Sequence, residues 1–162
     1  MLNLVVIILA VAIDQVSKFF IISYHNSSLF EQDIISNFLR FTYITNEGIA
    51  FGLNPFGQYS FILLAVSIIA ILFVVKILID SKHEPKLIQL SLSLIIGGAL
   101  GNLIDRFFTA FSLMSYNGVI DFIDIGIKEY RFYIFNFADF FISLGIILYL
   151  ISFIKSKIIN EQ

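Results

Sequence analysis

Four runs of apolar residues are each long enough to cross the hydrocarbon core of a membrane, which takes about 20 residues of α-helix. The chain is 59% hydrophobic, whereas apolar residues make up about half of a typical soluble domain. We therefore expect an all-α membrane protein that forms a single polytopic domain over residues 1–162. Its transmembrane helices are predicted at about residues 2–23, 59–79, 87–106 and 137–154.

The distribution of basic residues predicts how the chain is oriented. Lysines gather in the short loop between the second and third runs and in the C-terminal tail, whereas segments 24–58 and 107–135 hold few basic residues. Because short cytoplasmic loops carry an excess of Lys and Arg, both termini are expected in the cytoplasm and the two long segments outside. Asp14 and Lys18 interrupt the first run, and no basic stretch precedes it, so we expect a retained helix rather than a cleavable signal peptide.

The composition argues against several kinds of site. The chain has no cysteine, which excludes disulfides, thiolate metal sites and a cysteine nucleophile. His25 and His83 are expected on opposite sides of the membrane, so we predict neither a metal site nor a cofactor. Ser17 and Lys18 are adjacent on a helix and cannot form a Ser–Lys dyad there. A net charge of −2 argues against a nucleic acid partner.

Polar residues are rare in the predicted helices and gather near one end of them. An ionisable side chain at the bilayer centre costs about 2.5–3.5 kcal/mol on insertion scales, so such residues are candidates for function. With both termini inside, all of them lie near the outer face, and we predict that they form one site. They are Asp14, Lys18, Asn102, Asp105, Arg106, Asn136 and Asp139.

Structural roles remain open for two pairs of these residues. Asp14 and Lys18 are four residues apart and share a helical face, so they are either an ion pair between helices or contacts to a ligand. Asn136 and Asp139 also share a face at the start of the fourth run, where both can cap free N–H groups of the helix. Capping and a functional role are therefore both consistent with their spacing.

The outside segments contain strand-like stretches. Side chains alternate along a strand, so Asp121 and Asp124 are expected on opposite sides, and only one of them can join Asp139. Alternating polar and apolar residues and a high content of β-formers predict the strands, and a turn follows the first one. The strands are predicted at 39–44, 118–124 and 130–135, and the turn at 46–48.

Carboxylates remain as the reactive groups for this site. Two aspartates that share one proton can act as general base and general acid on one water molecule. Asp121 with Asp139 fits this description, although spacing alone does not decide between Asp121 and Asp124. The titration of such a dyad belongs to the pair rather than to either residue.

Five motifs together resemble those of the bacterial lipoprotein signal peptidases, or signal peptidase II, which are membrane aspartic proteases. The resemblance covers nearly the whole chain, with the motifs in order and at similar spacing. Each motif alone is weak, but five in order are highly specific. They are Asp14-Gln15-Val16-Ser17-Lys18, Asn46-Glu47-Gly48-Ile49-Ala50-Phe51-Gly52, Gly97-Gly98-Ala99-Leu100-Gly101-Asn102-Leu103-Ile104-Asp105-Arg106, Val119-Ile120-Asp121-Phe122 and Phe135-Asn136-Phe137-Ala138-Asp139.

The resemblance implies a role for each candidate residue. It implies Asp121 and Asp139 as the catalytic dyad and thereby selects Asp121 over Asp124. Ile49 stands where the family more often has a small residue, and this difference affects the expected fit around the substrate but not the chemistry. Residues that position the substrate or support the dyad would be Asn46, Gly48, Asn102, Arg106 and Asn136, and structural residues around them would be Asp14, Lys18 and Asp105.

The resemblance also implies the biology of the protein. It implies four transmembrane helices with a small β-rich cradle on the outer face, in the inner membrane of a bacterium. The implied substrate is a prolipoprotein that carries diacylglyceryl on its Cys and is cut just before that Cys, with membrane lipid as a second partner and the enzyme acting as a monomer. A site at lipid depth suits such a substrate, since each buried CH₂ contributes about 0.8 kcal/mol. From the residues alone, a small proton-coupled transporter and a non-enzymatic lipid-binding module are the alternatives.

Overall fold

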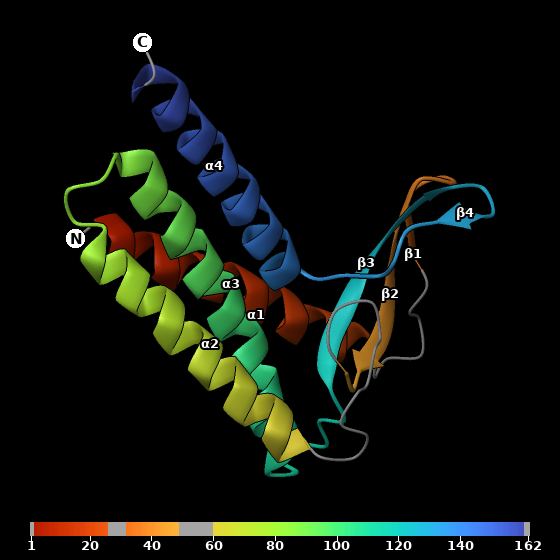
Figure 1. Ribbon diagram of the computed structural model, residues 1–162. Coiled ribbons are helices and arrows are strands. Elements are labelled where there is room, and N and C mark those ends of the chain that lie inside the picture. The colour runs from red at the N-terminus through yellow and green to blue at the C-terminus, as the bar shows by residue number, and fades with distance from the viewer. Residues whose placement is uncertain (1, 26–31, 49–59, 161–162) are drawn as a thin grey trace.

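The computed structural model describes residues 2–25, 32–48 and 60–160 and contains four long helices and a small antiparallel sheet (Figure 1). All four helices are long and apolar enough to cross a membrane. The predicted architecture of four transmembrane helices with a β-rich element is therefore confirmed. The helices are α1 (Leu2–His25), α2 (Ser60–Asp80), α3 (Lys86–Ala110) and α4 (Phe137–Asn160).

Helix α3 continues past its predicted end at Arg106 to Ala110. The segment predicted to lie outside the membrane from residue 107 therefore begins inside a helix. The aromatic ring of Phe107 packs on that of Phe111, with centroids 4.7 Å apart, and the Phe111 N–H bonds the Phe107 carbonyl, which extends the helix by a turn. Ser112, at φ 51°, then leaves the helical conformation.

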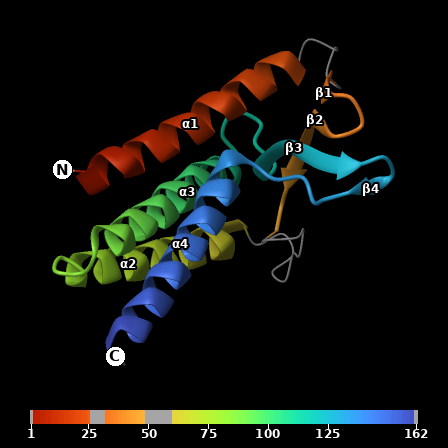
Figure 2. The same ribbon diagram turned by 90° about the horizontal axis from the view of Figure 1, so that it is seen from above.

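Helix α3 lies at the centre of the bundle and contacts each of the other three helices (Figure 2). Two glycines allow this close packing. A Cβ at Gly98 would collide with the carbonyl oxygen of Ala138 on α4, and a Cβ at Gly101 would lie 2.5 Å from a carboxylate oxygen of Asp14 on α1. Small residues at such positions let helix backbones approach closely in lipid. Helices α1 and α4 thus meet α3 at the level of the candidate polar residues.

The sheet lies beside the end of the bundle at which α4 begins (Figure 1). Its strands run in the order β1-β2-β3-β4, and each neighbouring pair is antiparallel. Strand β1 was not predicted, and the third predicted strand ends at Arg131, after which Phe135 alone forms a bridge with Ile123. The strands are β1 (Gln32–Ile35), β2 (Leu39–Asn46), β3 (Val119–Ile127) and β4 (Tyr130–Arg131).

A β-bulge interrupts the alternation of side chains in β3. The N–H groups of Phe122 and Ile123 both donate to the Phe135 carbonyl oxygen, at 3.1 and 2.7 Å. Both side chains are buried in one hydrophobic cluster, although they are consecutive in the strand. Two residues on the same side are what a bulge with one extra residue produces. Asp121 and Asp124, which flank this pair, therefore lie on the same side of the sheet, and the expectation of opposite sides was wrong.

Candidate active site

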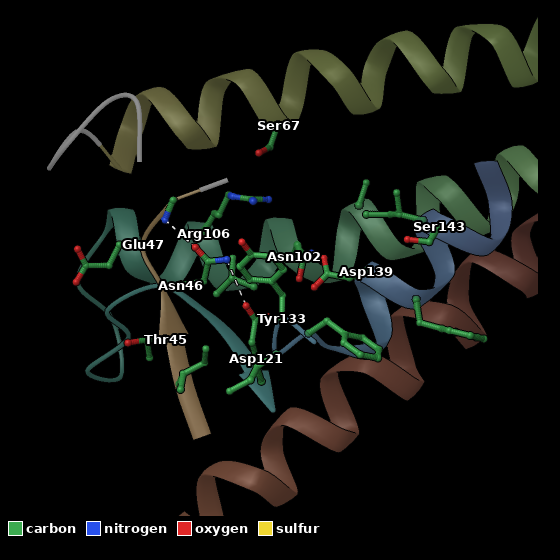
Figure 3. A pocket seen from close by; sticks show the side chains of 18 of the residues that line it. Thr45, Asn46, Glu47, Ser67, Asn102, Arg106, Asp121, Tyr133, Asp139 and Ser143 are labelled. Atoms are coloured by element: carbon green, nitrogen blue, oxygen red, sulfur yellow. Dashed lines mark hydrogen bonds between the residues drawn. The ribbon is translucent and has the colours of Figure 1, made fainter. Parts of the chain in front are cut away.

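Asp121 and Asp139 reach the same cavity from different elements (Figure 3). Asp121 lies in β3 and is 2% exposed, whereas Asp139 lies in the first turn of α4 and is half-buried. The side chain of Asp124 is instead held by Arg40 and Arg131, to which it forms ion pairs. The structure thus brings Asp121, rather than Asp124, together with Asp139.

Asn136 connects the two carboxyl groups. Its side-chain amide donates to Asp121 Oδ1 at 2.7 Å, and its side-chain oxygen accepts the backbone N–H of Asp139 at 2.9 Å. In return, Asp139 Oδ2 accepts the backbone N–H of Asn136 at 3.3 Å. This reciprocal pattern is a capping box, in which two otherwise unpaired N–H groups of a helix start are satisfied. Asn136 thus caps α4 and contacts Asp121 at the same time.

Two further amides donate to the carboxylates. Asn102 on α3 donates to Asp139 Oδ1 at 2.8 Å, and Asn46 at the end of β2 donates to Asp121 Oδ2 at 3.3 Å. The side-chain oxygen of Asn46 accepts the N–H of Gly48 at 3.0 Å, which fixes the Asn46 side chain at the turn after β2. Ile49, which follows this turn, lies outside the described residues. Each carboxylate is therefore oriented by amide donors from two places in the chain.

The environment of Asp121 favours its protonated form. Burial, and after it the negative charge of Asp139, raise the pKa of the Asp121 carboxyl from its ordinary value of 3.8 to about 7. Hydrogen bonds from Asn46 and Asn136 and the charge of Lys18 act in the opposite direction without cancelling the effect of burial. The pair of carboxyl groups therefore holds a proton close to neutral pH.

A buried ion cluster lies behind the two aspartates. Lys18 Nζ is 2.8 Å from a carboxylate oxygen of Asp14 and 2.8 Å from one of Asp105. None of the three residues is more than 1% exposed. Charges buried in this way are stable only when they are paired and hydrogen-bonded. The cluster joins α1 to α3, as one reading of the Asp14–Lys18 spacing predicted.

The buried cluster also contacts the backbone next to each aspartate. Asp14 Oδ1 accepts the N–H of Ala138 at 2.9 Å, and Asp105 Oδ2 accepts the N–H of Ile120 at 3.1 Å. Ala138 directly precedes Asp139, and Ile120 directly precedes Asp121. Lys18 Nζ additionally donates to Asn102 Oδ1 at 3.0 Å. The cluster therefore fixes the backbones that carry both aspartates.

Gln15 is part of this network and was missed as a candidate. Its side-chain amide donates to the Gly101 carbonyl oxygen at 3.0 Å and to Asp105 Oδ1 at 3.1 Å. It thus links α1 to α3 beside the ion cluster. The signal was its position next to Asp14, since a second polar residue in an apolar helix requires a partner.

The cavity in front of the aspartates has a volume of about 1130 Å³. One end of it is polar and includes Asn46, Asn102 and the half-buried Arg106 (Figure 3). From there it continues between α2, α3 and α4, where apolar side chains predominate and Ser67 and Ser143 are among the lining residues. A long apolar cavity with a few polar groups at one end suits an elongated amphipathic ligand. Among the described residues, no three His, Cys, Asp or Glu side chains are grouped to hold a metal ion.

Comparisons with known proteins agree on one family. The sequence model of the family described as signal peptidase (SPase) II matches residues 6–155. The lipoprotein signal peptidase of Clostridium tetani is 39% identical over 156 residues, which cover 95% of this chain and 93% of the relative. That of Buchnera aphidicola subsp. Schizaphis graminum is 38% identical over 145 residues, which cover 88% of this chain and 87% of the relative.

Two solved structures of bacterial membrane enzymes have the same fold. The first has a TM-score of 0.79 and 31% sequence identity, and the match covers 96% of this chain and 88% of that one. The second has a TM-score of 0.72 and 32% identity, and the match covers 94% and 92% of the two chains. The family match, the relatives and the four apolar helices lead to one conclusion: the chain belongs to the signal peptidase II family of bacterial multi-pass membrane proteases.

Proposed function

We propose that the protein removes the signal peptide from diacylglyceryl-modified prolipoproteins by cutting just before the lipidated Cys. The observation that carries this proposal is the position of Asp121 and Asp139, which are joined through Asn136 at the polar end of a cavity that continues between membrane helices. Such a cavity suits a substrate that reaches the two carboxyl groups from the lipid. The relatives named lipoprotein signal peptidase support the same substrate class.

The proposed chemistry is the direct attack of water on the peptide carbonyl. One carboxylate of the dyad takes a proton from the water molecule as its oxygen bonds to the carbonyl carbon. The other carboxyl group donates a proton to the amide nitrogen as the C–N bond breaks. The raised pKa of Asp121 supports this group as the one that holds the shared proton at neutral pH, which leaves Asp139 as the base.

The supporting residues act by orientation in this proposal. Asn46, Asn102 and Asn136 hold the two carboxyl groups toward the water, and Arg106 in the cavity lining contacts the substrate near the reacting bond. Gly48 fixes the turn that carries Asn46. Well-oriented reacting groups lower a barrier substantially, and small misplacements are costly.

We also propose that the protein forms one domain and acts as a monomer with both termini in the cytoplasm. The polar residues of α1, α3 and α4 would then lie near the outer face of the bacterial inner membrane, together with the sheet. The lysines of the loop after α2 and of the C-terminal tail support this orientation. A site at that depth is within reach of the acyl chains of a lipid-modified substrate.

Cleavage of a purified prolipoprotein tests the substrate class. The enzyme in detergent is given the same prolipoprotein with and without its diacylglyceryl group, and the products are identified by mass spectrometry. We expect a product that begins at the lipidated Cys, little turnover of the unlipidated form, and unchanged activity after addition of a chelator. Equal cleavage of both forms, or a cut elsewhere in the chain, would contradict the proposal.

A further inference from the structure

A second charged cluster lies in the sheet, outside the candidate active site. Asp124 on β3 is 6% exposed and forms ion pairs with an arginine on each of the two neighbouring strands. Its Oδ1 is 2.9 Å from Arg131 Nε, and its Oδ2 is 3.2 Å from Arg40 Nε. Because one carboxylate neutralises one guanidinium, these three side chains retain a positive charge. Among the described residues, Asp33, the neighbour of Arg40 on β1, forms no ion pair with it.

The hydrogen bonds of this cluster are incomplete. Arg131 Nη2 donates to the backbone oxygen of Asp124 at 2.9 Å, but Arg131 Nη1 is buried and has no partner in the part of the chain that the structure describes. Buried polar atoms without a partner are rare in folded proteins and call for an explanation. Arg40 is 36% exposed, so the cluster is accessible from its Arg40 side. An incoming oxyanion would find a surplus positive charge here, at the accessible Arg40 side.

The cluster lies on the face of the sheet that carries Asp121. The bulge in β3 places Asp124 on this face, and Arg40 is paired with Asp124 in the β2–β3 ladder. Arg131 reaches the same carboxylate from β4. The part of this face that carries Asp121 lines the cavity that continues between the apolar helices α2, α3 and α4. The charged cluster therefore shares a face of the sheet with the residue that lines the cavity.

Exposed apolar side chains surround this end of the sheet. The β3–β4 turn presents Ile127 at 68% and Tyr130 at 88% exposure, and the β1–β2 turn presents Ile35 and Phe38. Both turns project away from the helices (Figure 1). Aromatic and apolar residues next to basic ones are typical of protein surfaces at the level of the lipid headgroups. A soluble anion or a water-borne peptide would not account for this apolar surround.

We propose that Arg40, Asp124 and Arg131 form a binding site for the phosphate group of a membrane phospholipid. Guanidinium groups bind phosphate oxygens with paired hydrogen bonds, and a phosphate here would compete with Asp124 for the two guanidiniums. The lipid would anchor the far end of the sheet on the bilayer surface. This site rests only on the position of the sheet at the membrane and is independent of the proposed catalytic chemistry.

Retention of lipids by the purified full-length protein tests the site. The protein in detergent is mixed with phosphatidylglycerol or with a diacylglycerol that has the same acyl chains and no phosphate, and bound lipid is counted by native mass spectrometry. We expect about five-fold stronger retention of phosphatidylglycerol, as one favourable basic contact provides. Arg40→Gln should abolish this preference. Lys128→Gln, which removes an exposed charge from the β3–β4 turn, should leave it unchanged.

A third variant keeps the test decisive if Arg40→Gln affects folding. Asp124→Asn removes the internal carboxylate and frees both guanidiniums, so phosphatidylglycerol retention should rise, which a misfolded sheet would not produce. Equal retention of both lipids by the parent, or the same preference in Arg40→Gln and Lys128→Gln, would overturn the proposal. Displacement of phosphatidylglycerol by soluble glycerol phosphate at millimolar concentration would contradict a lipid as the ligand.

Discussion

The side-chain amide of Asn136 lies 2.7 Å from Asp121 Oδ1, and both groups are buried. Because Asn136 also caps the helix that carries Asp139, one side chain fixes the position of one carboxyl group relative to the other. A displacement of either group by an ångström is enough to lose about 100-fold in rate. The geometry of the dyad therefore depends on Asn136 as directly as on the aspartates themselves.

We expect Asn136→Ala to lower kcat at least about 100-fold with a smaller effect on KM, because orientation is lost while the cavity remains. The measurement is steady-state cleavage of lipidated prolipoprotein. Asn117→Ala serves as the control, since Asn117 is exposed and lies outside the cavity lining. Turnover by Asn136→Ala close to that of the control would show that the link through Asn136 between the two aspartates is dispensable.

The raised pKa of Asp121 predicts a titration near neutral pH. The carboxyl group of Asp121 should lose its proton at about pH 7, and cleavage should decline above that pH as the shared proton is lost. Infrared difference spectra of the carboxyl band can follow the titration directly. In Asp139→Asn the same band should titrate at a lower pH, because the negative charge that raises the pKa is gone. An unchanged titration in this variant would mean that the two groups do not interact.

Asp121 also makes stability depend on pH. Its pKa is about 7 in the folded protein against an ordinary value of 3.8, so the folded state binds more protons between these two values. The free energy of unfolding therefore falls as the pH rises from about 4 to about 7, and the contribution of Asp121 is constant above that window. Asp121→Asn should gain in Tm relative to the parent over this range, as measured by thermal unfolding in detergent. A Tm difference that is independent of pH would argue against the raised pKa.

Lys18 is expected to be essential for the stability of the bundle. Lys18→Met removes the ammonium group between Asp14 and Asp105 and leaves two buried carboxylates without a counter-charge. Loss of one member of a buried ion pair costs about 3–5 kcal/mol, which should appear in the free energy of unfolding. Lys76→Met, at an exposed position of α2, should change it by about 0.5 kcal/mol or less. Equal stability of the two variants would contradict the role of the cluster.

Much of the site could be predicted because the membrane makes polar residues conspicuous. Asp14, Lys18, Asn102 and Asp139 interrupt apolar runs, and the direction of each helix places them at one depth. The structure brings these residues into one hydrogen-bonded network. What spacing could not supply is the partner of each group, since the contacts of Asp14 with the backbone of Ala138 depend on how the helices are packed.

The sheet was harder to predict than the helices. Alternation along the strand put Asp121 and Asp124 on opposite sides, but the bulge at Phe122 and Ile123 reverses that pattern. The bulge depends on the pairing of β3 with Phe135, which lies outside the strands, and this pairing leaves no periodic signal in the sequence. Strand β1 was missed for a related reason, because a four-residue edge strand is too short to show alternation.

The central claim is that Asp121 and Asp139 together activate the hydrolytic water, and cleavage of lipidated prolipoprotein by Asp121→Asn and Asp139→Asn tests it most directly. Both variants keep the shape of the side chain, so each should retain the thermal unfolding transition of a folded protein. We expect each to lose at least about 100-fold in kcat, the range of a general acid or base. A folded variant of either residue that cleaves at nearly the parent rate would contradict the dyad.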